Sequence, residues 1–207
     1  MLSTLLAFLG ACALIAASPG PSTMLIIRQS LRSRRAGFLT VLGNETGVFV
    51  WGVAAALGLT ALLAASQVAY DVLRIAGAVV LVVFGVKALL DARRGHGVEE
   101  DGQEEPVARS GGAAYRSGLL LNLANPKAAV FAMSFLPQFV PAGVPPLPAM
   151  IALAAVWAVF EVGYYGMYVW FVGRLRAVLS RAGVRRRLEQ VSGGVLLLLG
   201  VRMAVEG

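Results

Sequence analysis

The sequence predicts an all-α, polytopic integral membrane protein with six transmembrane helices in a single transporter domain, residues 1–207. Of the 207 residues, 58% are hydrophobic and only 14% are charged, and the mean hydropathy is +0.76. A soluble domain has about 25% charged residues. Uncharged runs cover residues 1–27, 46–70 and 128–160, and each exceeds the roughly 18 residues that separate a membrane span from a buried core helix.

The first half of the chain is expected to contain three spans. The first covers residues 2–27; because no Lys or Arg precedes Arg28, it lacks the basic start of a signal peptide and is interpreted as a span. The second covers residues 38–65 and the third residues 68–90. Residues 91–116 contain six acidic residues and are expected to form a mobile polar loop.

The second half is expected to contain three further spans, at residues 117–140, 147–173 and 188–205. Four prolines lie between the first two of them and predict a tight turn, since proline ends one helix and can begin the next. These are Pro141, Pro145, Pro146 and Pro148.

The basic residues predict the orientation of the chain. Four of them follow the first span, five follow the third and six follow the fifth, which is fifteen of the eighteen in the chain. The opposite side has only Arg74 and Arg202, and Lys127 lies inside a span. Loops rich in Lys and Arg stay on the cytoplasmic side. The polar loop should therefore be cytoplasmic, and both termini should lie on the outer side of the cell inner membrane. The net charge of +7 is typical of a nucleic-acid-binding protein, but here the basic residues lie in short clusters between apolar runs. Such clusters are not expected to form a nucleic-acid-binding groove.

Two halves of three spans, about 1–90 and 117–207, predict an inverted repeat, because an odd number of spans reverses the second half. Prolines interrupt the first span of each half, at Pro19/Pro21 and at Pro126. The second span of each half has one acidic residue two positions before a glycine, at Glu45 and at Glu161.

The segment Ser18-Pro19-Gly20-Pro21-Ser22 predicts a discontinuous first span. Proline removes a backbone donor and glycine loosens the chain, and free backbone groups at membrane depth must line a cavity or meet protein partners. A packed kink is the alternative.

The segment Asn125-Pro126-Lys127 predicts a second helix break. Asn favours the N-cap and Pro the first helical position, and the positive end of the new helix, with Lys127, suits a carboxylate. A buried lysine costs at least ~2.5 kcal/mol unless it is paired or hydrated. The alternative is that Lys127 snorkels to the cytoplasmic interface.

Glu45 and Glu161 are the other charges expected inside the membrane and are candidates for proton coupling. A static ion pair with Lys127 or Arg28, or an interfacial position, is the alternative for each. Cys12 is expected to be a packing residue and His96 a loop residue. With so few thiols and carboxylates in the spans, no metal site and no other cofactor are expected.

These residues resemble the LysE/RhtB superfamily of amino-acid exporters (LysE-type translocators). The resemblance is carried by Ser18-Pro19-Gly20-Pro21, by Gly37, Gly43 and Gly47, and by Asn125-Pro126-Lys127 with the later Leu136-Pro137-Gln138-Phe139. It covers nearly the whole chain and implies proton-driven export of amino acids across the inner membrane. Ser22 and Val48 depart from the family's pattern, which puts the substrate in doubt more than the family.

The sequence therefore predicts a secondary transporter, and not an enzyme, that exports amino acids or close analogues by proton antiport. The expected substrate-binding residues are Ser18, Pro19, Gly20, Pro21, Asn125, Pro126 and Lys127. The expected partners are the amino acid, protons and the lipid bilayer. The Gly43–Gly47 pair leaves a homo-oligomer open. The alternatives are export of another small solute on the same fold and, less favoured, an intramembrane enzyme.

Overall fold

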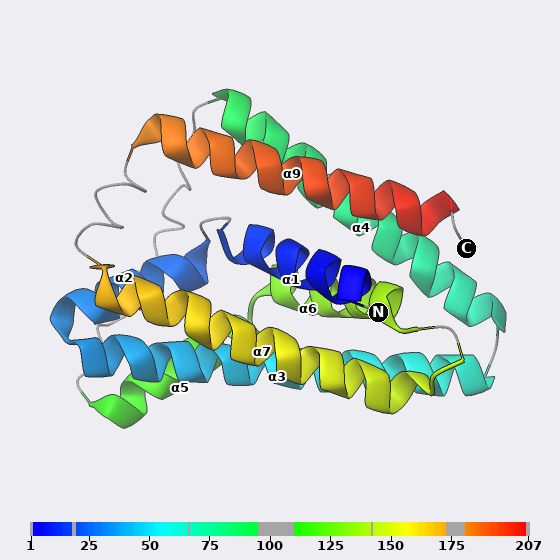
Figure 1. Ribbon diagram of the computed structural model, residues 1–207, viewed down its shortest axis with the longest axis horizontal. Helices are drawn as coiled ribbons and strands as arrows, with labels where there is room; N and C mark the ends of the chain where they lie inside the picture. The colour runs from blue at the N-terminus through cyan, green and yellow to red at the C-terminus, as the bar shows by residue number, and fades with distance from the viewer. Residues whose placement is uncertain are drawn as a thin grey trace.

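A computed structural model of the chain describes residues 2–17, 20–65, 67–94, 110–141, 143–172 and 181–205. Within these residues every regular element is a helix, as predicted (Figure 1). In the first half these are α1 (Leu2–Ala17), α2 (Pro21–Arg32), α3 (Arg34–Ala65) and α4 (Gln67–Arg94). The second half has α5 (Gly111–Leu123), α6 (Pro126–Phe135), the short 3₁₀ helix η1 (Leu136–Phe139), α7 (Pro146–Trp170) and α9 (Ala182–Val205).

Helix length and composition identify up to four candidate membrane spans among the described residues. Arg34–Ala61 within α3 and Pro146–Trp170 are each long and apolar enough alone. Two bent pairs also qualify if each counts as one span: Thr4–Ala17 with Pro21–Arg32, and Gly111–Leu123 with Ala128–Phe139. α4 and α9, with 28 and 24 residues, have the length of a span, and the predicted total of six remains a prediction.

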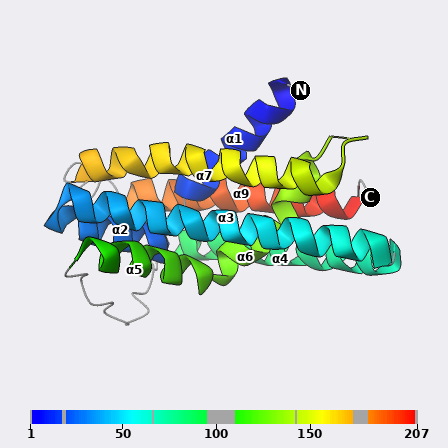
Figure 2. The ribbon, with the colours of Figure 1, turned by 90° about the horizontal axis from the view of Figure 1, so that it is seen from below.

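The order of elements is similar in the two halves. A bent pair comes first (α1 and α2, or α5 and α6), followed by two long helices (α3 and α4, or α7 and α9). In Figure 1, α4 and α9 lie side by side, and α3, α5 and α7 form a second group, with α1 and α6 between them. Figure 2 shows α3 and α7 running along the length of the molecule, with the shorter α5 beside the first part of α3.

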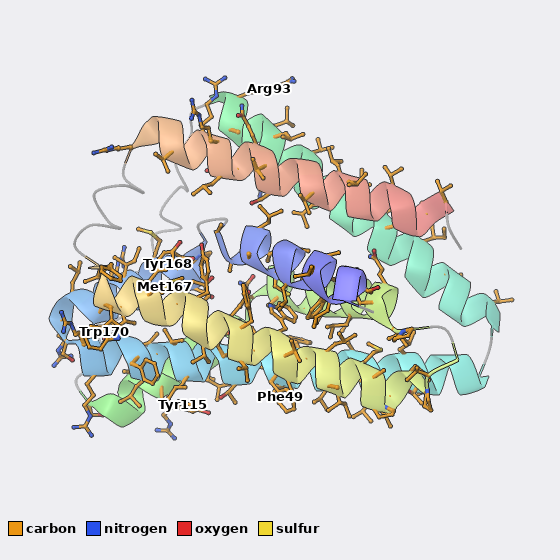
Figure 3. All side chains as sticks on the ribbon, viewed as in Figure 1. Phe49, Arg93, Tyr115, Met167, Tyr168 and Trp170 are labelled. Atoms are coloured by element: carbon orange, nitrogen blue, oxygen red, sulfur yellow. The ribbon has the colours of Figure 1, made fainter. Side chains whose placement is uncertain are left out.

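The ends of the helices that adjoin the basic clusters lie at one end of the molecule. In Figure 1 the end of α2, the start of α3, the end of α4, the starts of α5 and α9, and the end of α7 are all at the left. Figure 3 places Arg93, Tyr115 and Trp170 toward that end. The start of α1 and the end of α9 both lie toward the opposite end.

Several helices extend beyond the predicted spans. The polar loop was expected over 91–116, but α4 continues to Arg94 and α5 begins at Gly111, where the Ser110 hydroxyl accepts a 3.2 Å hydrogen bond from Ala113 N. α9 begins at Ala182 and not at 188. Polar residues continue these helices beyond their apolar segments, so a boundary drawn at the first charge misplaces the helix end. Pro146 and Pro148, which were expected in a turn, belong to α7, with Pro146 as its first residue.

The centre of the bundle is apolar and aromatic. Phe8 and Cys12 of α1 are fully buried against Phe135, and Cys12 is thus the packing residue that was predicted. The Phe8 and Phe135 rings are stacked with centroids 5.4 Å apart, and Phe131 stacks on Phe135 at 4.2 Å. The aromatic stack joins α1 to α6. His96 lies outside the described residues.

Candidate functional site

A cavity of about 70 Å³ lies where the two bent helix pairs meet. It is lined by residues from both sides of each break and from the two long helices α3 and α7: Ile15, Ala16, Gly20, Pro21, Ser22, Thr23, Asn44, Val48, Asn122, Asn125, Ala128, Phe131, Trp157, Glu161 and Tyr165. One water needs about 10–15 Å³ on this measure, so the space suits a group of roughly five to seven heavy atoms, the size of a small amino acid.

The first break places the start of α2 at this cavity. α1 and α2 are bent by 68°. Gly20 caps α2 with an extended backbone, φ −144° and ψ −176°, and without a side-chain cap; Pro21 is the first helical residue. The first hydrogen bond of α2 runs from Met24 N to Gly20 O at 3.1 Å, so the N–H groups of Ser22 and Thr23 have no partner within the helix. Such N–H groups attract an anion. The predicted discontinuity of this span is thus confirmed.

The second break places the start of α6 at the same cavity. α5 and α6 are bent by 60°. α6 begins at Pro126, and Asn125 O accepts hydrogen bonds from Ala128 N at 3.1 Å and from Ala129 N at 3.3 Å. The predicted helix start at Asn-Pro is therefore confirmed. Two helix N-termini from opposite halves of the chain border one small space.

Two carboxyl groups lie next to each other at this site. Glu161 of α7 lines the cavity, and Glu45 of α3 is 2% exposed and close enough to Glu161 to interact with it. Oε1 of Glu45 accepts a 2.8 Å hydrogen bond from Asn44 Nδ2. Oε2 of Glu45 has no hydrogen-bond partner among the described atoms, and the carboxyl group of Glu161 is a close neighbour of Glu45.

Two asparagines extend the polar site toward the second break. Asn122 Nδ2 donates to Asn44 Oδ1 at 3.3 Å, so hydrogen bonds run from Asn122 through Asn44 to Glu45. The backbone oxygen of Asn122 accepts from the Trp51 indole at 3.3 Å. The side chains of Asn122 and Asn44 are each 3% exposed, which places this polar chain inside the protein.

Three buried polar atoms of cavity-lining residues have no hydrogen-bond partner among the described atoms. They are Ser22 Oγ, Asn122 Oδ1 and Trp157 Nε1. Most buried polar groups in proteins are paired, so each unpaired group calls for an explanation, such as a bound water or ligand.

The structure brings together most of the residues that the sequence singled out. The cavity is lined by Gly20, Pro21, Asn125 and Glu161. Glu45 lies next to Glu161 but is not itself among the lining residues. Ser18 and Pro19 lie outside the described residues. The backbones of Pro126 and Lys127 form the start of α6, but their side chains also lie outside the described part of the chain.

Sequence reasoning missed several residues of the cavity wall. Asn44, Asn122 and Trp157 were not predicted, although a buried Asn in an apolar span is costly and therefore a signal of function. Tyr165 was missed as well; its hydroxyl donates to Ala16 O at 3.4 Å. No pattern in the sequence distinguishes Trp157 and Tyr165, because both lie in an apolar helix among other aromatic residues.

Comparison with known proteins yields one family and several efflux proteins. The model of the LysE type translocator family matches residues 13–207. The chain is 29% identical over 180 residues to the threonine efflux protein of Escherichia coli (strain K12), covering 85% of this chain and 84% of that protein. It is 25% identical over 199 residues to the homoserine/homoserine lactone efflux protein of Salmonella typhi, covering 96% of this chain and 94% of that protein.

A further relative is the uncharacterised membrane protein YrhP of Bacillus subtilis (strain 168), with 26% identity over 204 residues that cover 96% of this chain and 97% of that protein. No solved structure matches the chain. The family match spans both helix breaks and both long helices that form the cavity. The chain therefore belongs to the LysE type translocator family, as its residues predicted.

Proposed function

We propose that this protein is a secondary transporter that exports amino acids or close analogues across the cell inner membrane by proton antiport. The observation that carries the proposal is the meeting of two helix N-termini and the Glu161 carboxyl group at one small cavity. Helix N-termini attract anions, and a carboxylate attracts cations, so the cavity has the two charges that a zwitterion needs.

The proposed substrate class rests on the size of the cavity and on the similarity of the chain to named efflux proteins. A cavity of about 70 Å³ favours a small amino acid over a bulky one, and the named efflux relatives act on threonine and on homoserine or its lactone. The substrate's carboxylate is proposed to lie near Asn125, Pro126 and Lys127. The segment Ser18-Pro19-Gly20-Pro21 is proposed to lie against the same carboxylate.

Proton coupling is proposed to use Glu45 and Glu161. Two neighbouring carboxyl groups repel each other when both are ionised, and they share a single proton more readily. Because Glu161 lines the cavity and Glu45 adjoins it, an arriving ammonium group competes with the proton for the same pair. Competition of this kind couples the release of one ion to the binding of the other.

The proposed topology has six spans as two inverted repeats, with the polar loop in the cytoplasm and both termini outside. Two features support it: the basic ends of the helices lie together, and the start of α1 and the end of α9 lie toward the opposite end (Figure 1). Homo-oligomer formation through the Gly43–Gly47 pair is less favoured, because Gly43 packs against the Tyr115 backbone and Gly47 against Asn122 of the same chain.

The test is transport by purified protein in liposomes, with a panel of labelled amino acids and with or without an imposed proton gradient. Small amino acids should move against their own concentration gradient when protons flow down their gradient in the opposite direction. A protonophore should abolish this movement. Transport that ignores the proton gradient would contradict antiport. A panel without any transported amino acid would contradict the substrate class.

A second candidate is export of a small solute without a free carboxylate. It is favoured by the relative named for homoserine lactone, because a lactone has its carboxyl group closed into an ester. Including the lactone and the parent amino acid in the same panel separates the two candidates.

A further inference from the structure

The cavity offers hydrogen-bonding atoms that the protein itself leaves unused. The indole nitrogen of Trp157 is a donor only, and Oδ1 of Asn122 is an acceptor only. Both side chains line the cavity, they are 2% and 3% exposed, and neither atom has a partner among the described atoms. An unpaired buried polar group costs about 1–3 kcal/mol, so each of these two atoms would gain from a hydrogen bond to a bound molecule.

The Trp157 indole packs against a series of aromatic rings. Its ring meets Phe131 edge to face with centroids 5.0 Å apart, and Phe131 stacks on Phe135 at 4.2 Å. Phe135 in turn stacks on Phe8. A donor fixed by packing loses little entropy when it binds a ligand. The aromatic stack therefore positions a free N–H group before the substrate arrives.

The Asn122 amide is held by a chain of hydrogen bonds that begins at Glu45. Asn44 Nδ2 donates to Oε1 of Glu45, and Asn44 Oδ1 accepts from Nδ2 of Asn122. With one N–H of its amide used in this way, Asn122 keeps Oδ1 as an acceptor for a ligand.

Gly47 of α3 provides the room for this arrangement. A Cβ atom at position 47 would lie 2.8 Å from both Cβ and Oδ1 of Asn122. The asparagine thus packs directly on the backbone of α3, and its side chain has little freedom to turn away.

We propose that Trp157 and Asn122 recognise the two ends of a zwitterionic substrate in this cavity. The Trp157 N–H donates to the substrate's carboxylate, and Asn122 Oδ1 accepts from its ammonium group. The Ser22 hydroxyl, which also has no partner among the described atoms, and the N–H groups at the start of α2 supply further donors for the carboxylate. This inference rests on the proposed function, and it adds the residues that distinguish an amino acid from its uncharged derivatives.

The experiment measures transport by liposomes containing wild type or Trp157→Phe, with a small amino acid, its amide and its N-acetyl derivative as competitors. Phenylalanine keeps the aromatic packing and removes the N–H. The apparent KM for the amino acid should rise about tenfold or more, as expected for a lost hydrogen bond to a charged group, and the preference for the acid over the amide should fall. The preference for the free amine over the N-acetyl derivative should be kept.

Trp170→Phe is the matched control, because Trp170 is 63% exposed at the end of α7 and does not line the cavity. Asn122→Leu is the second variant: it should lose the preference for the free amine over the N-acetyl derivative while keeping the preference for the acid. Should Trp157→Phe not reach the membrane, Asn122→Leu decides, with Ser117→Ala as its control on α5.

The outcomes separate the inference from the proposed function. Wild-type transport with unchanged KM and unchanged preferences in both variants would overturn the inference alone. Absence of amino-acid transport by the wild type would overturn the proposed function and the inference with it. A rise in KM that leaves both preferences intact would show a structural role for these side chains and would also overturn the inference.

Discussion

Asn122 of α5 donates a 3.3 Å hydrogen bond to Asn44 of α3, and this bond joins the second helix break to the helix that bears Glu45. α3 and α5 pack closely against each other along this contact, here called the seam. Toward the basic end, the Tyr115 hydroxyl donates to Thr46 Oγ1 at 2.9 Å. Gly43 lies directly against the Tyr115 backbone, and Gly118 against Thr40. Gly43 and Gly47, which the family resemblance includes, therefore let α3 approach α5 closely, at Tyr115 and at Asn122.

The first prediction concerns this seam. Gly43→Ala should lower the free energy of unfolding by about 1–3 kcal/mol, the usual cost of overpacking, because its new Cβ would collide with the Tyr115 backbone. The measurement is thermal denaturation in detergent, followed by size-exclusion chromatography.

Gly166→Ala in α7 is the matched control for this variant. A Cβ atom at Gly166 would have nothing within 4 Å, so its denaturation temperature should stay the same or rise slightly. Equal denaturation temperatures for the two variants would show that α3 and α5 do not pack as described.

The second prediction concerns proton coupling. At least one of Glu45→Gln and Glu161→Gln should abolish proton-driven export while the protein remains inserted and abundant, because glutamine keeps the shape of the side chain and cannot bind or release the proton. The measurement is uptake of labelled amino acid by inverted vesicles with an imposed proton gradient.

Glu189→Gln is the control for the two carboxyl variants. Glu189 is also buried, at 8% exposure, but it does not line the cavity, so its variant should retain coupling. If Glu45→Gln and Glu161→Gln both export like wild type, these acids are structural and the proton uses another route.

The third prediction concerns topology. Single cysteines at His96 and Ala182, in a Cys12→Ala background, should be shielded from an impermeant thiol reagent in intact cells, because both positions adjoin basic clusters. A cysteine at Gly143, in the turn where Val144 N bonds to Pro141 O, should react. Labelling of positions 96 and 182 from outside would contradict six spans with outward termini.

The fold was largely predictable because hydropathy depends on each segment alone. Apolar runs located the long helices, and the prolines at positions 21 and 126 located the starts of α2 and α6. The helix ends were less predictable: Arg116 was placed at the edge of a loop, but it lies within α5. Charged residues continue a helix at low cost once the chain leaves the apolar layer, so charge does not mark where the helix ends.

The candidate site was predictable only in part. Glu161 and Asn125 were found because a charge or an Asn-Pro pair in an apolar run is conspicuous in the sequence. The proximity of Glu45 to Glu161 was not found, because it depends on how α3 packs against α7. Trp157 was missed for a similar reason: only the three-dimensional arrangement shows that its indole nitrogen has no partner among the described atoms.

The last prediction concerns Lys127, the second residue of α6. A lysine at this depth is costly unless it is paired or hydrated, and it follows the helix start that borders the cavity. We predict that it contacts the substrate's carboxylate. Lys127→Met keeps the length of the side chain and removes the charge. Loss of a charge-assisted contact worth ~1.5–3 kcal/mol should weaken the apparent affinity by roughly ten- to a hundredfold.

Lys127→Arg should be tolerated only in part, because a planar guanidinium group needs more room than an ammonium group. The deciding comparison is a substrate against its amide: wild type should prefer the acid, and Lys127→Met should lose that preference. Because Lys127 contributes a full charge and Trp157 a neutral donor, Lys127→Met should reduce the preference more than Trp157→Phe does. If Lys127→Met transports the free amino acid as well as wild type, Lys127 is a structural ion-pair partner, and the carboxylate lies with the start of α2 and the Trp157 indole alone.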